Sequence, residues 1–373
     1  MSRIGYDAKR LFNNFTGLGN YSRTLLQNLV TYYPEEVYFL YTPKVVKCPE
    51  THFFLDSPMF TVRQPQPHQK LFWRSLRVKA LLKRDKIELY HGLSHEIPLG
   101  MDKLGIPSVV TMHDLIFKHY PEHYGYFDRL VYDFKFRYAC KHASGIIAIS
   151  ESTKRDIIHW YDIPQEKIKV IYQSCSDHFM QEKSPETISE LLRHYGLPAD
   201  YLLYVGSLVE RKNLLGIVEA LALLPTDLQL PLVIVGQGAA YKQKVLRRAR
   251  QLGVADKLLF VQVAYADLPA VYQQAQVFVY PSYFEGFGIP VIEALYSKTP
   301  VVTSNVSSLP EAAGPGSKLV PPADYHAIAA AIQELLTDTS ARQQAIEAGW
   351  AYVQRFNGQA LTEELVDYYK CFL

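Results

Sequence analysis

Short apolar runs alternate with longer stretches of helical periodicity along nearly the whole chain. This order is typical of parallel β-sheets whose connecting helices cover both faces. We therefore expect an α/β protein with doubly wound, Rossmann-like sheets. The candidate strands of the first half are residues 3–7, 37–41, 88–91, 108–113, 145–150 and 167–172, and those of the second half are residues 201–205, 232–235, 257–261, 277–280 and 300–303.

The chain length and the number of strands indicate two domains. A chain of 373 residues with 48% hydrophobic residues can bury two separate cores. The polar stretch at residues 173–187 interrupts the alternation as a linker does, so we place an N-terminal domain at residues 1–178 and a C-terminal domain at residues 179–352. Ligands of such sheets bind beyond the carboxyl ends of the strands, so two facing sheets would form an interdomain cleft.

Composition excludes several classes of function. The formal net charge is +2, so no overall field favours nucleic acid. The four cysteines are far apart and form no Cys-x-x-Cys pair, which argues against a disulfide framework or a zinc site and for a reducing, cytoplasmic setting. We expect neither a signal peptide nor a membrane span, because no apolar stretch is long enough.

Two glycines, Gly17 and Gly19, open a helical pattern after the first candidate strand. Glycine lets backbone N–H groups approach an anion, and a helix N-terminus adds partial positive charge, so this loop can hold a phosphate. An ordinary glycine-rich turn is the alternative. Nine residues (8–16) separate the strand from the glycines, and the second candidate strand ends without an acidic residue, which disfavours a nicotinamide-dependent dehydrogenase.

His113 and Asp114 follow the fourth candidate strand. A histidine at the carboxyl end of a strand can contact a substrate hydroxyl or the reaction centre, and an adjacent carboxylate can fix its tautomer. A purely structural pair is the alternative.

The turn from Gly206 and Ser207 to Asn213 places two adjacent cations, Arg211 and Lys212, just before a helix. The dipole of a helix disfavours cations at its N-terminus, and a bound diphosphate would resolve the conflict. A solvated basic turn is the alternative.

Residues 281–294 carry the most informative motif. The turn Gly286-Phe287-Gly288 follows a strand and leads into a helix, so its backbone N–H groups can face a ligand. Glu285 lies in this loop and Glu293 lies eight residues later, inside the helix. The two carboxylates can therefore contact different parts of one elongated ligand.

These motifs together resemble glycosyltransferase family 4, whose members have the GT-B fold and retain the anomeric configuration of the sugar. The resemblance covers nearly the whole chain, and the overall similarity is to bacterial mannosyltransferases of the family. It rests on Glu-x7-Glu, the Gly-Ser-x3-Arg-Lys-Asn turn and Leu309-Pro310-Glu311 in the second half, and on the glycine loop, His113-Asp114 and residues 147–152 in the first.

The resemblance implies a role for each motif. In the donor domain, Gly206, Ser207, Arg211 and Lys212 would hold the donor diphosphate, Glu293 the ribose hydroxyls, and Glu285 with the backbone of Gly286, Phe287 and Gly288 the transferred sugar. In the other domain, Gly17 and Gly19 would approach the distal phosphate, and His113 and Asp114 would lie near the sugar and the acceptor.

The chemistry expected from this family needs no metal and no cofactor. The chain has no Asp-x-Asp motif, and Arg211 and Lys212 can stabilise the departing diphosphate instead. The usual proposal is attack from the face of the leaving group, so we assign Glu285 to positioning and not to a nucleophilic role. We expect a hexosyl donor, with guanosine-linked mannose first and uridine-linked glucose second, and a part in polysaccharide or glycolipid assembly.

Three segments depart from the family pattern. Residues 171–175 stand where relatives show Pro-Asn-Gly, Gln262 stands where a glycine is common, and residues 356–358 lack the usual tryptophan. The amphipathic run at residues 359–369 nevertheless resembles the last helix of the family, so we expect residues 353–373 to cross back onto the N-terminal domain.

The acceptor is less clearly marked than the donor. Residues 70–86 interleave seven cations with apolar residues and are expected to form a basic amphipathic helix, which is a candidate contact with the anionic inner face of the cell membrane and a lipid-linked acceptor. An ordinary helix packed on its apolar face is the alternative. The aromatic segment at residues 118–138 is a candidate wall of a saccharide site, or part of the core.

Three other functions are compatible with this fold. They are a sugar-nucleotide epimerase, a phosphorylase with a lysine-bound pyridoxal cofactor, and a sugar-nucleotide-binding protein without transfer activity. The Arg-Lys turn with Glu-x7-Glu argues against the first, and every charged position that transfer needs is filled, which argues against the last.

Overall fold

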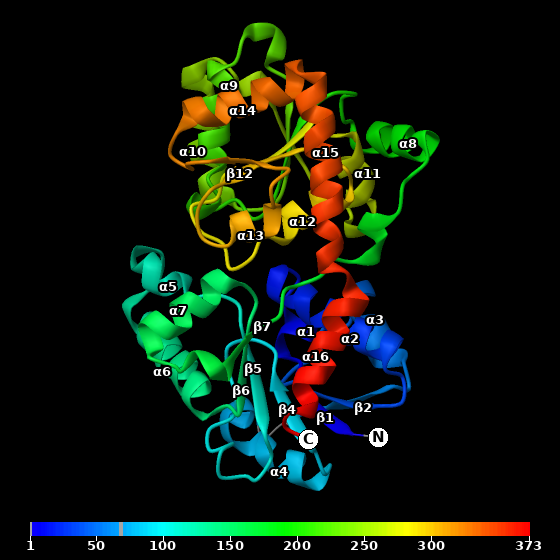
Figure 1. Ribbon diagram of the computed structural model, residues 1–373, viewed down its shortest axis with the longest axis vertical. Helices are drawn as coiled ribbons and strands as arrows, with labels where there is room; N and C mark the ends of the chain where they lie inside the picture. The colour runs from blue at the N-terminus through cyan, green and yellow to red at the C-terminus, as the bar shows by residue number, and fades with distance from the viewer. Residues whose placement is uncertain (1, 67–69) are drawn as a thin grey trace. The chain divides into compact units, whose positions relative to one another are not determined.

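The computed structural model describes residues 2–66 and 70–373, and its chain forms two compact units (Figure 1). The first unit contains Met1–Ser174 and Gly358–Leu373, and the second contains Cys175–Asn357. The sequence placed these boundaries a few residues away, after residues 178 and 352. Gly358–Leu373 therefore belongs to the first unit, although it follows the second unit in the chain.

The first unit is built on a seven-stranded sheet in the order β3-β2-β1-β4-β5-β6-β7, in which every strand pairs in parallel with its neighbours. The order of the strands reverses between β1 and β4: β2 and β3 lie on one side of β1, and β4 to β7 lie on the other. The strands are β1 (Arg3–Asp7), β2 (Val37–Tyr41), β3 (Phe60–Arg63), β4 (Leu89–Gly92), β5 (Ser108–Met112), β6 (Gly145–Ala148) and β7 (Ile168–Val170). The helices are α1 (Lys9–Asn13), α2 (Gly17–Tyr32), α3 (Pro49–Asp56), α4 (Val78–Arg84), α5 (Ile116–His119), α6 (Tyr126–His142), α7 (Glu151–Tyr161) and α16 (Gly358–Lys370).

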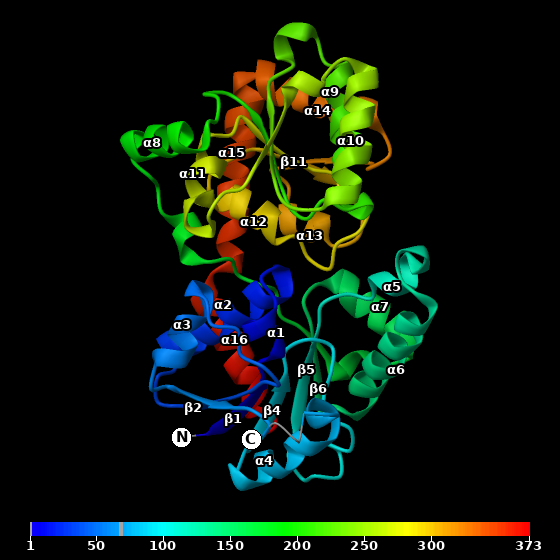
Figure 2. The ribbon, with the colours of Figure 1, turned by 180° about the vertical axis from the view of Figure 1, so that it is seen from behind.

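Both faces of this sheet are buried, which explains why its strands are nearly continuous apolar runs. Successive side chains of a strand point to opposite faces. In β2, Tyr38 and Leu40 belong to one core cluster, whereas Phe39 and Tyr41 belong to the other. Helix α16 lies beside α2 in both views (Figures 1 and 2) and adds Tyr369 to the first of these clusters.

The second unit repeats the plan with a six-stranded parallel sheet in the order β10-β9-β8-β11-β12-β13. Its strands are β8 (Leu202–Val205), β9 (Leu232–Val235), β10 (Leu258–Val261), β11 (Val277–Tyr280), β12 (Val301–Ser304) and β13 (Lys318–Val320). Its helices are α8 (Pro185–Tyr195), α9 (Leu214–Leu223), α10 (Ala239–Leu252), α11 (Leu268–Gln274), α12 (Ile289–Tyr296), α13 (Leu309–Ala313), α14 (Tyr325–Thr337) and α15 (Thr339–Val353). The expected pair of doubly wound, Rossmann-like sheets is thus confirmed.

The single helix expected over residues 70–86 is wrong in its extent. Phe72 has a positive φ of 52°, a five-residue π-helical turn covers Trp73–Arg77, and α4 follows as only Val78–Arg84. Trp73, Val78 and Leu82 are buried in the core of the first unit, so most of the apolar side of this segment is occupied by packing. Throughout the described residues, every helix is too short or too polar to span a lipid bilayer.

Candidate active site

The strand order of the second unit reverses between β8 and β11, and ligands of open α/β sheets bind at such a point, beyond the carboxyl ends of the strands. Two of the predicted motifs follow these two strands. The turn beginning at Gly206 follows β8, and the loop from Pro281 to Gly288 follows β11. The structure therefore brings the basic turn and the first glutamate of Glu-x7-Glu to one edge of one sheet.

The two cations of the turn converge on Glu285. Arg211 Nη1 lies 3.0 Å and Lys212 Nζ lies 3.4 Å from Glu285 Oε1. Arg211 also donates to the carbonyl of Phe284, and Lys212 donates to the hydroxyl of Tyr280. The side chains of the three charged residues are only 12–17% exposed. Because two cations share one carboxylate, the cluster carries one positive charge in excess.

Glu285 is held as a carboxylate. Its Oε1 accepts hydrogen bonds from Tyr280 Oη at 2.9 Å and from Ser282 Oγ at 2.8 Å. Burial alone would raise the pKa of Glu285, but Lys212 and Arg211 lower it to about 2. Burial lowers the pKa of Lys212, and the nearby Glu285 acts in the opposite direction. Glu285 therefore keeps its negative charge, which offsets part of the conflict expected for cations at a helix start.

Glycines and capping residues shape the two loops. Gly206 (φ 158°) and Gly288 (φ 133°) have backbone conformations that side chains disfavour, and a Cβ atom at Gly206 would lie 3.3 Å from Lys212 Cδ. Ser207 lies next to Gly206, and its carbonyl accepts a hydrogen bond from Tyr204. Asn213 Oδ1 caps α9 by accepting from the Gly216 N–H at 3.1 Å. The sequence motif thus has a local structural basis as well as an electrostatic one.

Ser307 and Ser308 support the Glu285 loop, although no sequence motif predicted either residue. Ser307 Oγ accepts from the Glu285 N–H at 3.1 Å, and Ser308 Oγ donates to the carbonyls of Glu285 and Phe287, both at 2.8 Å. Gly286 lies between these bonded residues. The sequence predicts a loop just before Leu309. Nothing local in the sequence predicts that Ser307 contacts Glu285, which lies 22 positions earlier.

Glu293 lies in a different environment from Glu285, in the second turn of α12. It is 5% exposed, and Tyr272 Oη donates to its Oε2 at 3.0 Å. Burial raises the pKa of Glu293 to about 8, although the Tyr272 hydrogen bond and Lys212 oppose the shift. Near neutral pH the two glutamates of the motif thus differ in charge, because Glu285 is ionised and Glu293 is mostly protonated.

In the first unit, Gly17 and Gly19 open α2 as expected, but they serve different purposes. A Cβ atom at Gly19 would overlap the carbonyl oxygen of Asn14, so this glycine allows α1 and α2 to pack together. A Cβ atom at Gly17 would meet nothing within 4 Å. Packing therefore requires a glycine at position 19 but does not require one at position 17.

His113 is buried at the end of β5, and the carbonyl of Leu93 fixes its tautomer. His113 Nε2 lies 2.9 Å from this carbonyl, which can only accept, so Nε2 carries the proton. Its Nδ1 accepts from the side-chain amide of Gln173 at 3.3 Å. Burial lowers the pKa of His113 to about 4. The expected fixing of the tautomer by Asp114 is therefore wrong; Asp114 Oδ1 accepts from the N–H of Ile116 at 3.1 Å.

A buried polar network lies beside His113, and no sequence motif predicted it. His91 is hydrogen-bonded through Nδ1 to Tyr369 Oη at 2.5 Å and through Nε2 to Thr111 Oγ1 at 2.8 Å. Tyr21 Oη lies 3.0 Å from the same Thr111 oxygen. The network joins α2 and α16 to the sheet, and burial lowers the pKa of His91 to about 3.

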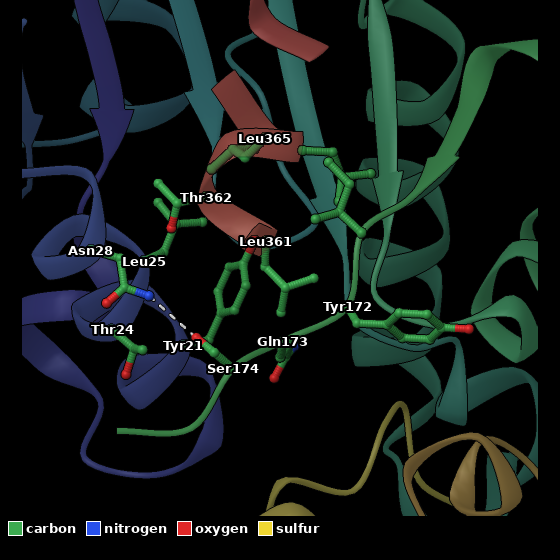
Figure 3. A pocket seen from close by; sticks show the side chains of 12 residues that line it. Tyr21, Thr24, Leu25, Asn28, Tyr172, Gln173, Ser174, Leu361, Thr362 and Leu365 are labelled. Atoms are coloured by element: carbon green, nitrogen blue, oxygen red, sulfur yellow. Dashed lines mark hydrogen bonds between the residues drawn. The ribbon is translucent and has the colours of Figure 1, made fainter. Parts of the chain in front are cut away.

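Two pockets of the first unit differ in what they can hold. The pocket in Figure 3 is lined by α2, α16 and residues 171–174, with a 3.3 Å hydrogen bond between Asn28 and Ser174, and it encloses only about 30 Å³. That space holds about one water molecule. A second pocket of about 250 Å³ is lined by α5, α6 and the turn between them, including Phe117, Tyr126 and Arg129. The second pocket has room for a monosaccharide.

Two Rossmann-like units of this topology are characteristic of the GT-B fold. The comparison with known proteins agrees. Residues 15–175 match the family model described as Glycosyltransferase Family 4, and residues 196–351 match the model described as Glycosyl transferases group 1. The O-antigen chain mannosyltransferase B of Escherichia coli is 30% identical over 371 residues, which cover 95% of this chain and 96% of that protein. The chain is therefore a glycosyltransferase and belongs to glycosyltransferase family 4.

Other relatives and solved structures are consistent with this assignment. The O-antigen chain mannosyltransferase RfbU of Salmonella typhimurium is 29% identical over 266 residues, which cover 71% of this chain and 69% of that protein. The sucrose-phosphate synthase of Thermosynechococcus elongatus superposes with a TM-score of 0.79 at 22% identity and covers 99% of this chain and 98% of its own. HepE of Anabaena, crystallised with UDP, superposes with a TM-score of 0.77 at 18% identity over the whole of both chains. At these identities the solved structures show the fold alone.

Proposed function

We propose that this protein transfers a mannosyl group from a guanosine-diphosphate donor to an acceptor hydroxyl in polysaccharide or glycolipid assembly, without a metal ion and with retention of configuration. The observation that carries the proposal is the Arg211–Lys212–Glu285 cluster at the strand-order reversal of the second sheet. Mannosyltransferase relatives of similar length support the choice of sugar.

In the proposed reaction, the bond between the anomeric carbon and the diphosphate oxygen breaks, and its electron pair leaves with the diphosphate. Arg211 and Lys212 stabilise the negative charge that develops there. The acceptor oxygen forms its bond to the anomeric carbon on the same face, and its proton passes to the leaving phosphate oxygen. Glu285 positions the cations and the sugar, which suits a carboxylate whose Oε1 already accepts from Tyr280 and Ser282.

A binding screen followed by a transfer assay tests this proposal. A ligand that binds only the folded state raises the apparent melting temperature. We expect GDP and GDP-mannose to raise it more than UDP and UDP-glucose, and labelled mannose to pass from GDP-mannose to a lipid or saccharide fraction. Stabilisation by UDP alone would overturn the choice of donor. Stabilisation by none of these ligands would overturn the glycosyltransfer proposal, and binding with no turnover on any acceptor would favour a binding protein.

We propose that the pocket beside α6 holds part of the saccharide acceptor. Its exposed aromatic side chain, Tyr126, can stack on a sugar ring, and Arg129 can donate to hydroxyls. Only part of the aromatic segment 118–138 is available for this role, because Phe136 belongs to the buried core.

We also propose that residues 70–77 contact an anionic membrane surface. Leu71, Phe72 and Leu76 are 44–69% exposed in this short segment, and the exposed cation Arg77 lies beside them. Apolar side chains inserted among lipid headgroups and cations facing anionic lipid both favour such binding. A second exposed apolar stripe lies on α6, where Phe127 and Phe134 are 79% and 61% exposed.

Flotation with liposomes distinguishes these two surfaces. We expect the wild type to float with vesicles that contain anionic lipid and not with neutral ones. Changing Leu71, Phe72 and Leu76 to serine together should abolish flotation, whereas the matched variant Phe127→Ser/Phe134→Ser should float normally. Loss of flotation only in the α6 variant would move the contact to α6 and contradict the proposal for residues 70–77.

A further inference from the structure

The strand order of the first sheet also reverses next to a basic pair. Lys9 and Arg10 follow β1, just as Arg211 and Lys212 follow β8. The strands β1 and β8 hold the same place in their sheets, since each is the third strand from one edge and borders the strand where the order reverses. The two units therefore carry adjacent cations at corresponding ends of corresponding strands.

The acidic side chains near the end of β1 are already paired with other cations. Arg74 lies 2.5 Å from Asp7 and 2.8 Å from Glu96, and Lys135 lies 3.0 Å from the second oxygen of Glu96. Over residues 2–66 and 70–373, the side chains of the basic pair form no ion pair. Four cations thus share two carboxylates, which leaves an excess of two positive charges.

The basic pair lies in surroundings that make this excess costly. Both side chains are partly buried, and Arg10 Nε is enclosed without a hydrogen-bond partner. Burial lowers the pKa of Lys9, and the neighbouring Arg74 lowers it further. Arg10 also disfavours the charged form of His113, which places its guanidinium near the residue expected at the sugar. Glu96 and Asp7 act in the opposite direction on Lys9, but partly buried cations that outnumber the nearby carboxylates are unfavourable, and a bound anion would offset the penalty.

The start of α2 lies close to the helix that carries the basic pair. The position of a Cβ atom at Gly19 lies 3.1 Å from the carbonyl of Arg10, so the helix that carries the pair touches the first turn of α2. At the neighbouring Gly17 a Cβ atom would meet nothing within 4 Å. The N-terminal end of this 16-residue helix also carries partial positive charge, and the N–H of Gly19 there donates to Asn14 Oδ1 at 3.0 Å.

We propose that Lys9 and Arg10 bind a phosphate group of a substrate in the first unit, either in the diphosphate of the donor or on a phosphorylated acceptor. This inference rests on the glycosyltransfer function proposed above and adds a recognition site that the family motifs do not mark. The pair binds the phosphate by charge-assisted hydrogen bonds and thereby compensates the excess charge.

Calorimetric titration of the full chain tests this site without measuring turnover. The probes are GDP, UDP and inorganic pyrophosphate. The variants are Lys9→Ala/Arg10→Ala, the charge-conserving Lys9→Arg/Arg10→Lys, and Lys83→Ala/Arg84→Ala as a control that removes the same charge from exposed positions of the same unit. We expect the first variant to bind at least one probe about tenfold or more weakly, since each lost bond to a charged group is worth 1.4 kcal/mol or more, and the other two to bind nearly as the wild type does.

The outcomes separate the two sources of the phosphate. Weaker binding of GDP or UDP supports the donor diphosphate. Unchanged nucleotide binding, with loss of pyrophosphate binding to the nucleotide-saturated protein, supports an acceptor phosphate. Unchanged binding of all three probes overturns the inference, and so does a clear fall in melting temperature of the alanine variant, because removing crowded cations should leave stability unchanged or raise it. A wild type that binds pyrophosphate through this pair but no nucleotide would overturn the proposed function alone.

Discussion

Replacing Lys212 by alanine is expected to lower the turnover number about 10²–10³-fold, with a much smaller effect on folding. In the proposed reaction, Lys212 and Arg211 supply the positive charge that the departing diphosphate needs, and only the transition state carries the full negative charge of the diphosphate. Arg211 still pairs with Glu285 at 3.0 Å in this variant, so the buried carboxylate keeps one counter-charge. Initial rates of mannosyl transfer at saturating donor, with the melting temperature of the same preparation, measure both effects.

Two further variants make this result specific. Lys244→Ala removes a cation of the same unit from an exposed ion pair with Glu210 and should leave the rate unchanged. Glu285→Gln keeps the shape of the side chain but releases both cations from their carboxylate, and it should slow transfer while leaving measurable activity. Wild-type rates in both Arg211→Ala and Lys212→Ala would contradict the proposed role of these cations in transfer. Rescue of Glu285→Ala by azide, with an azido sugar as product, would instead show that Glu285 is a nucleophile.

Glu293 is expected to contribute to the stability of the folded protein, and this contribution is expected to fall as the pH rises from about 5 to about 8. The folded pKa of Glu293 is raised from 4.5 to about 8 by burial, so the folded state binds this proton more tightly than the unfolded state does. The contribution is fully present below pH 4.5 and is lost as the pH passes through the folded pKa. Its limiting slope is about 1.4 kcal/mol per pH unit.

Glu293→Gln isolates this contribution. Glutamine has nearly the same shape, and its amide oxygen can accept the hydrogen bond from Tyr272 that Glu293 Oε2 accepts at 3.0 Å. Urea unfolding of both proteins at several pH values gives the difference in free energy of unfolding. The wild type should lose stability relative to the variant between pH 5 and 8. A constant difference over this range would mean that Glu293 is already ionised in the folded protein.

The sequence predicted most of the fold because nearly all strands are buried on both faces. Every candidate strand formed within a few residues of its expected ends, and 37–41, 232–235 and 277–280 agree residue by residue. The two strands that were missed, Phe60–Arg63 and Lys318–Val320, lie at the edges of the two sheets. Edge strands are short and partly exposed, so polar residues interrupt the apolar run that marks a strand.

The candidate site was predictable where its residues share a motif. Arg211, Lys212 and Glu285 follow strands that are adjacent in the sheet, so the fold class alone places them together. The contacts that hold them were not predictable, since Ser308 reaches Glu285 across 23 positions. The sequence did not predict Lys9 and Arg10 as site residues, because a basic pair after a strand is ordinarily interpreted as the solvated start of a helix. Only the pairing of the nearby carboxylates with Arg74 and Lys135 shows that the pair is left with an excess of charge.

The return of α16 to the first unit has a consequence for biosynthesis. Tyr369 of this helix is hydrogen-bonded to His91, and Leu365 lies in the same core cluster as Leu29. A ribosome therefore releases every residue of the second unit before it supplies the final helix of the first. The second unit can complete its fold while the nascent first unit still exposes part of an apolar face, and that face is covered only after residues 358–370 have been synthesised.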